Sequence, residues 1–122
     1  MVFRTFILTT LLMLSLGSLA ADSEGIYKAL GHATDSCGKF VEAANKGLHK
    51  NNWAKWNIYL AFTYGYFTGV NRYRSDTLDI MGNTDQAGVM GHIEKYCREN
   101  PLSDYFYAVM SAENELYKNR VK

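Results

Sequence analysis

The clearest helical pattern of this chain lies in residues 35–50, whose sequence is DSCGKFVEAANKGLHK. Apolar side chains recur in it at intervals of four, three and four residues, which is the spacing of one face of an α-helix. Thr34 or Asp35 is a suitable N-cap, and glycine, asparagine and cationic residues gather at the other end, as is typical of a helix C-terminus. The stretch predicts an amphipathic helix whose buried face carries Cys37, Val41, Ala44 and Leu48, with Phe40 beside them.

Residues 53–72 follow with a helical pattern of a different kind, because apolar and aromatic side chains cover nearly its whole circumference. Such a helix is expected in the middle of a fold. Gly65 and Gly69 stand four residues apart, and we expect another helix backbone to pack closely against them, with helix dimerisation as the alternative. The least apolar stripe is expected to reach solvent or a partner; it consists of Asn57, Ala61, Tyr64, Thr68 and Asn71.

Two further helices are predicted after a long loop at 73–83. Asn83 or Thr84 is the expected N-cap of a helix that reaches about residue 100 and turns Cys97 inward. Pro101 predicts the first turn of a fourth helix, since the N–H that proline lacks has no partner there. The expected core face of this helix carries Leu102, Tyr105, Val109, Ala112 and Leu116. With a short helix over 26–30, the predicted fold class is all-α, a small four-helix or five-helix bundle.

Residues 1–20 predict a cleavable secretory signal peptide. Arg4 precedes an apolar stretch at 6–16, and small residues lead up to a cleavage point after Ala20 or Ala21. The apolar stretch is shorter than the about 20 residues that a membrane-spanning helix needs. Subtracting these 20 residues from 122 leaves a single predicted domain at 21–122, with its core at about 34–118.

The 2 cysteines of the chain, Cys37 and Cys97, lie on the predicted core faces of the first and third main helices. An exported chain folds in an oxidising compartment, where an even number of cysteines indicates disulfides. We therefore expect one disulfide, which would join those two helices.

Charge and motif content exclude several function classes. Removing Arg4 from the 13 basic side chains leaves 12, which balance the 12 acidic ones, whereas nucleic-acid binding needs a concentrated basic surface. The 3 histidines stand in separate segments without a second ligand at zinc spacing, and Met81 occupies a position where a calcium loop needs oxygen. We expect no metal, no cofactor, no enzymatic activity, and no nucleic-acid or membrane partner for the mature form.

The aromatic content favours a protein partner. The chain has 9 Tyr and 2 Trp, and tyrosine together with arginine dominates protein interfaces. The candidate partner-binding residues lie at the end of the 53–72 helix and in the loop that follows: Tyr64, Arg72, Tyr73 and Asp76. The alternative is that Tyr73 covers the core and that the arginines are simply solvated.

The sequence YGYFTGVN at 64–71, followed by IEKYCRENP at 93–101 and a helix that contains Ala108, resembles a known pattern. It resembles the Rap and Tai families of periplasmic immunity proteins from type VI secretion and, more distantly, the acid-stress chaperone HdeA. The resemblance covers residues 36–117. In many relatives a cysteine precedes the Gly-Tyr pair, whereas Thr63 and Tyr64 precede it here, so the disulfide arrangement of the immunity proteins does not carry over.

The resemblance implies a non-enzymatic periplasmic protein that binds another protein. The leading hypothesis is an inhibitor that occludes the active cleft of a cell-wall-degrading effector. The alternative is an HdeA-like chaperone for unfolded clients, which would loosen in acid as its 12 carboxylates become protonated. A small enzyme is the third hypothesis, for which no catalytic constellation is visible in the sequence.

Overall fold

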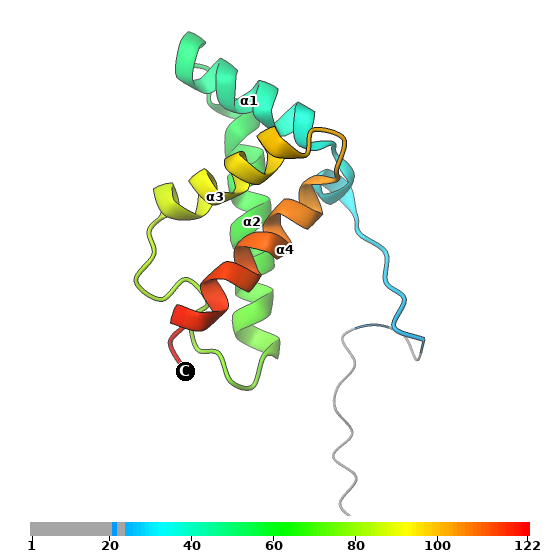
Figure 1. Cartoon of the computed structure of the whole chain (residues 1–122), viewed down its shortest axis with the longest axis vertical. Helices are drawn as coiled ribbons and strands as arrows, with labels where there is room; N and C mark the ends of the chain where they lie inside the picture. The colour runs from blue at the N-terminus through cyan, green and yellow to red at the C-terminus, as the bar shows by residue number, and fades with distance from the viewer. Residues whose placement is uncertain (1–20, 22–23) are drawn as a thin grey trace, which may run out of the picture.

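The structure, a computed structural model, describes residue 21 and residues 24–122. It is all-helical, as predicted, with α1 Cys37–Lys50, α2 Ala54–Tyr73, α3 Gln86–Glu99 and α4 Tyr105–Leu116 (Figure 1). Two short 3-10 turns, η1 Gly31–Thr34 and η2 Tyr117–Asn119, complete it, so the short helix expected over 26–30 is replaced by a turn just after it. The predicted signal peptide lies outside the described residues. Across the described part of the chain, no helix is both long enough and apolar enough to cross a bilayer.

The predicted disulfide is present and joins α1 to α3. Cys37 and Cys97 are both fully buried, and their Cα atoms lie 4.7 Å apart. Around the bond, the core is built from α1, α3 and α4, whose largest fully buried side chains include Phe40, Ile93 and Tyr105. The prediction that these two helices are stapled together is confirmed.

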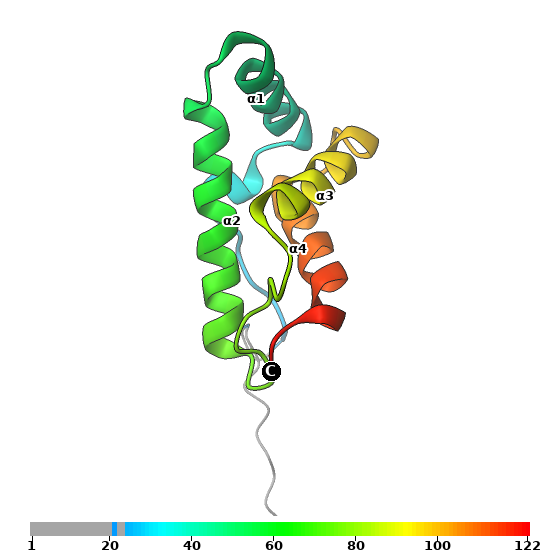
Figure 2. The same cartoon turned by 90° about the vertical axis from the view of Figure 1, so that its left-hand side faces the viewer.

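The long helix α2 lies along one side of the molecule and not in its middle (Figure 2). It buries only Tyr59, Thr63 and Phe67, because many of its aromatic side chains are half-covered, with polar ends or edges toward solvent. The predicted central position is therefore wrong. The stripe predicted to be least apolar is indeed the outer one: Asn57, Ala61 and Thr68 are exposed, and Tyr64 and Asn71 are half-buried.

Close packing on the two α2 glycines is also a wrong prediction. A Cβ built at Gly65 or Gly69 would meet no atom of the described chain within 4 Å, apart from the neighbouring backbone of α2 itself. Close packing is found instead at Gly47 near the end of α1, where any side chain would clash: a Cβ would lie 2.3 Å from the ring of Trp53. Leu48, predicted for the core, is 63% exposed, because the final turn of α1 buries its Gly47 side beneath Trp53 instead.

Long-range backbone hydrogen bonds explain why α4 begins later than the sequence predicts. The first amides of α1, at Cys37 and Gly38, donate to the carbonyls of Ser103 (2.7 Å) and Pro101 (3.0 Å). The segment from Pro101 therefore satisfies orphan donors of another helix as a turn, and α4 begins only at Tyr105. Leu102, predicted for the core, sits in that turn and is 94% exposed.

The N-caps also differ from the predicted residues. Ser36 caps α1, accepting from the amide of Lys39, in place of Thr34 or Asp35. Asp85 caps α3, accepting from the amide of Gly88 at 2.8 Å, in place of Asn83 or Thr84.

Candidate functional site

The C-terminal end of α2, the loop after it and the C-terminal segment lie together at one end of the molecule, which we call the distal end (Figures 1 and 2). Backbone hydrogen bonds join the loop to the C-terminal segment: the amide of Leu78 donates to Val121 (2.9 Å) and the amide of Val121 donates to Asp79 (2.9 Å). The side chain of Asn71 accepts from the amide of Ile80 at 2.7 Å, and Ile80 is fully buried. The loop is thus fixed to α2 and to the end of the chain.

Two arginines contact the ring of Tyr117 at the distal end. The guanidinium carbons of Arg74 and Arg120 lie 4.5 Å and 3.7 Å from the ring centroid of Tyr117. The Tyr117 hydroxyl donates to the carboxylate of Asp76, which also pairs with Arg120 at 3.0 Å. The hydrogen bond from Tyr117 is the main cause that lowers the pKa of Asp76. Asp76, a predicted partner-binding residue, is therefore held by contacts within the chain, and its side chain remains 45% exposed.

A buried carboxylate ties α2 to α4 behind this network. Glu113 is buried, pairs with Arg74 at 3.1 Å, and accepts a hydrogen bond from the hydroxyl of Tyr66. Burial and the hydrogen bond to Glu113 raise the pKa of Tyr66. A charge in this position is stable because two donors satisfy its oxygens.

Arg72 and Tyr73, two of the predicted binding residues, project from the distal end. Tyr73 is 80% exposed, and the guanidinium carbon of Arg72 lies 5.4 Å from its ring centroid. In the described structure neither side chain makes another hydrogen bond, ion pair or ring contact. Leu78 and Val121, which sequence reasoning missed, are 69% and 45% exposed at the same end. We call Arg72, Tyr73, Leu78 and Val121 the distal patch.

Tyr64 does not belong to the distal patch. It lies more than two helical turns earlier in α2, and its hydroxyl donates to the side chain of Gln86 at the start of α3 (3.3 Å). The structure thus brings Arg72 and Tyr73 together, places Asp76 in the network beside them, and separates Tyr64 from all three.

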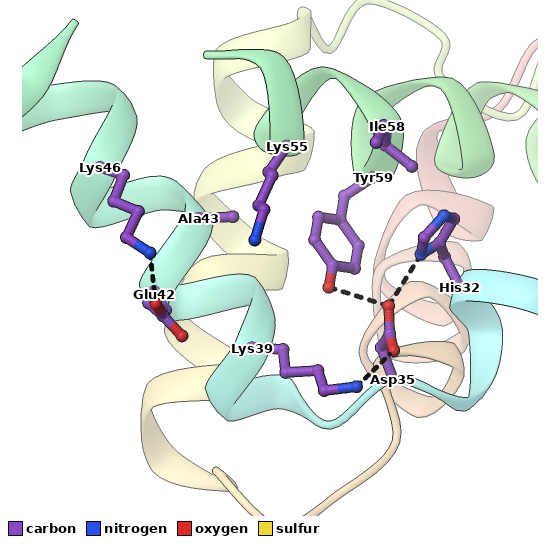
Figure 3. A pocket seen from close by; sticks show the side chains of 9 residues that line it. All are labelled: His32, Asp35, Lys39, Glu42, Ala43, Lys46, Lys55, Ile58 and Tyr59. Atoms are coloured by element: carbon purple, nitrogen blue, oxygen red, sulfur yellow. Dashed lines mark hydrogen bonds and ion pairs between the residues drawn. The ribbon is translucent and has the colours of Figure 1, made fainter. Parts of the chain in front are cut away.

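A second site lies at the opposite end of α2, in a cavity of about 380 Å³ between η1, α1 and α2 (Figure 3). Asp35 forms one wall and accepts from His32 Nδ1 (2.8 Å), the Tyr59 hydroxyl (3.0 Å) and Lys39 Nζ (3.0 Å). The bond from His32, followed by those from Lys39 and Tyr59, lowers the pKa of Asp35 to about 2. Burial and the bond to Asp35 raise the pKa of Tyr59.

The remaining charges of this cavity come from lysines and one further carboxylate. Lys46 pairs with Glu42 at 2.5 Å, whereas Lys55 makes no hydrogen bond or ion pair with any described residue. We call this site, lined by His32, Asp35, Lys39, Glu42, Ala43, Lys46, Lys55, Ile58 and Tyr59, the basic pocket. The sequence signals for it were the spacings of four residues from Asp35 to Lys39 and from Glu42 to Lys46, which indicate pairs on one helix face but not a cavity.

One histidine, His92, lies beside a serine hydroxyl. His92 Nε2 and Ser111 Oγ lie 3.1 Å apart between α3 and α4, within reach for a base and a nucleophile. No carboxylate of the described chain accepts from the other ring nitrogen of His92, so the pair lacks the third member of a triad. The described residues also contain no group of three or more histidine, cysteine or acidic side chains that could hold a metal ion.

No protein-family model, no curated protein and no solved structure matches this chain.

Proposed function

We propose that this chain is an exported, non-enzymatic binding domain that docks its distal patch on a protein partner. The observation that carries the proposal is the state of Tyr73, which is 80% exposed and has Arg72 as its one ring contact in the described structure. Large rigid tyrosines and arginines supply most of the energy in protein interfaces, and they do so where they can be desolvated by a partner.

The backbone beneath the distal patch supports docking because it is already ordered. Backbone hydrogen bonds join the loop at Leu78 to the C-terminal segment at Val121. The hydrogen bond from Tyr117 to Asp76 is a second connection between the loop and that segment. A partner that binds this end does not have to order the loop, so less of the interaction energy is lost to conformational entropy.

The class of partner follows from the compartment and from the resemblance. The Cys37–Cys97 disulfide fits an oxidising compartment, and the predicted signal peptide would deliver the chain there. The resemblance to the Rap and Tai immunity families favours a periplasmic location and a cell-wall-degrading effector from type VI secretion as the partner. In this proposal the distal patch occludes the effector's active cleft.

Site-specific photocrosslinking in the periplasm tests the proposal. A photoreactive amino acid replaces Leu78 in one strain and, as a matched control away from the distal end, Tyr107 of α4, which is 51% exposed. We expect one dominant protein adduct from position 78 that is absent from position 107. Equal adducts from both positions, or none from position 78, would contradict a specific interface at the distal patch.

The captured partner then allows affinities to be compared. Tyr73→Ala is expected to weaken binding by about 30-fold, which corresponds to the about 2 kcal/mol of an interface hot spot. Tyr107→Ala, which also removes an exposed tyrosine ring, is expected to leave the affinity unchanged. An unchanged affinity for Tyr73→Ala would show that the distal patch is not the binding site.

One observation favours the second candidate, an acid-stress chaperone like HdeA. Asp35 links η1, α1 and α2 through its three hydrogen bonds, and because its pKa is lowered to about 2, strong acid is needed to protonate it and weaken those bonds. A chaperone of this kind would expose apolar surface at about pH 2 to 3, bind a hydrophobic dye and suppress the aggregation of an acid-denatured client. A chain that binds dye in acid but protects no client would be acid-labile without being a chaperone.

A further inference from the structure

We propose that the basic pocket binds a small organic anion, with a carboxylate or phosphate group held by Lys55 and a short apolar part resting on Tyr59 and Ile58. This site lies at the other end of α2 from the distal patch and does not depend on the proposed protein-binding function. The juxtaposition behind it is three lysines from two helices around one cavity of about 380 Å³ that contains only two carboxylates.

The charges of the pocket leave one cation uncompensated. Lys39 is neutralised by Asp35 at 3.0 Å and Lys46 by Glu42 at 2.5 Å. Lys55 reaches into the cavity from α2 and acts on Glu42 only from a distance, without forming an ion pair (Figure 3). A concave site with surplus positive charge concentrates anions, and its field adds to the direct contact with the ammonium group.

The two carboxylates of the pocket already have donors. Asp35 accepts from His32, Tyr59 and Lys39, whereas Glu42 accepts from Lys46 through Oε1 and its side chain remains 63% exposed. An anion can use the ammonium group of Lys55 without breaking any of these contacts. Three lysines against two carboxylates therefore favour a negatively charged ligand.

The α2 side of the pocket, which also carries Lys55, can hold the apolar part of a ligand. Tyr59 is buried and its ring is held in place by the hydrogen bond to Asp35 and by edge contacts with Phe40 and His32. Ile58 also lines the cavity and is 43% exposed, so its side chain is accessible to a ligand. The volume is near the lower end of the about 300–1,000 Å³ that is usual for ligand pockets, which fits a small ligand with one ring or a short chain.

NMR titration of the disulfide-bonded chain from residue 21 onward tests this inference, in low salt and with three probes that share a phenyl ring. Benzoate carries the carboxylate, phenyl phosphate carries the phosphate, and benzamide is the neutral counterpart. We expect saturable shifts for the amides of Lys55, Ile58 and Tyr59 with at least one of the two anions, and none with benzamide. The stronger of the two anions identifies the preferred headgroup.

Two matched variants separate the pocket from general attraction to lysines. Lys55→Gln removes the uncompensated charge and is expected to weaken anion binding at least tenfold. Lys95→Gln removes an exposed lysine of α3 that makes no ion pair, and it is expected to leave binding unchanged. Circular dichroism and the thermal midpoint establish that both variants are folded. Equal binding of benzamide, non-saturating shifts at all exposed lysines, or undiminished binding by Lys55→Gln would each overturn the proposal.

Discussion

Breaking the Cys37–Cys97 disulfide should remove a large part of the stability of this fold. The bond closes a loop with a sequence separation of 60 residues, and it joins α1 to α3 at the centre of the core. In the chain-entropy description, a loop of this length lowers the entropy of the unfolded state by an amount that corresponds to about 4 kcal/mol at 25 °C. Since a small domain has about 5–15 kcal/mol of stability in total, the reduced chain should be marginally folded.

Urea unfolding of oxidised and reduced wild-type chains measures this difference without changing any side chain. Both sulfurs are fully buried, so the reduced form has to be prepared by unfolding in reductant and refolding with reductant present. With a denaturant slope of about 1–3 kcal/mol per molar urea, the midpoint should fall by about 1–4 M. The double variant Cys37→Ala/Cys97→Ala should fall at least as far, because it also leaves a cavity in the core.

Two results would refute this reasoning. If the midpoints of the oxidised and reduced chains agree, the bond contributes nothing beyond the packing of the two sulfurs. If the double alanine variant loses stability but the reduced wild type does not, the loss comes from the cavity and not from the freed chain.

Three further changes have outcomes that follow from the local structure. Gly65→Ala combined with Gly69→Ala should raise the free energy of unfolding by about 1–2 kcal/mol, because alanine favours a helix and no atom blocks either Cβ; thermal unfolding would show a lower midpoint if that face is packed. Asp35→Asn should flatten the acid side of the stability profile: the pKa of Asp35 is 3.8 unperturbed and about 2 when folded, so its stabilisation is complete above pH 4 and is lost as the pH falls through about 2. Urea midpoints between pH 5 and pH 2 that fall equally in variant and wild type would contradict this role. Thr63→Val should cost about 1 kcal/mol in urea unfolding, because the buried hydroxyl of Tyr105 loses its 2.8 Å partner and keeps the Tyr59 carbonyl at 3.4 Å, and the added change Tyr105→Phe should recover part of the loss.

The sequence was informative where the structure is local. The spacing of apolar residues predicted α1 and α3 to within a few residues, and it placed both Cys37 and Cys97 on inner faces, since a helix fixes which side chains share a face. The start of α4 could not be predicted in the same way. Pro101 is an acceptable first residue of a helix, but its carbonyl accepts from Gly38, a residue distant in sequence, and local preference gives way to that contact.

Composition was a poor guide to position for α2. Its aromatic content predicted a central helix, yet tyrosines with hydrogen-bonded hydroxyls, such as Tyr59 and Tyr66, can lie at the boundary of a core. Arg72 and Tyr73 were chosen from interface composition, and both are exposed. The contacts of Asp76 with Arg120 and Tyr117 could not be predicted, because those residues come from the distant C-terminal segment. The basic pocket was missed for a related reason: its walls come from three separate elements, and none of them alone carries a motif.

The two proposed sites should act independently, because α2 separates them. Lys55 and Tyr73 lie near opposite ends of this helix, and a rise of 1.5 Å per residue puts about 27 Å between their Cα atoms. That distance exceeds the Debye length of about 8–10 Å in physiological salt, so the charge of a bound anion is screened before it reaches the distal patch. We expect Lys55→Gln to leave partner affinity unchanged and Tyr73→Ala to leave anion affinity unchanged, each within a factor of two. A larger effect of either change on the other site would mean that α2 moves between two arrangements with different affinities for both ligands. The disulfide-bonded fold would then not be rigid.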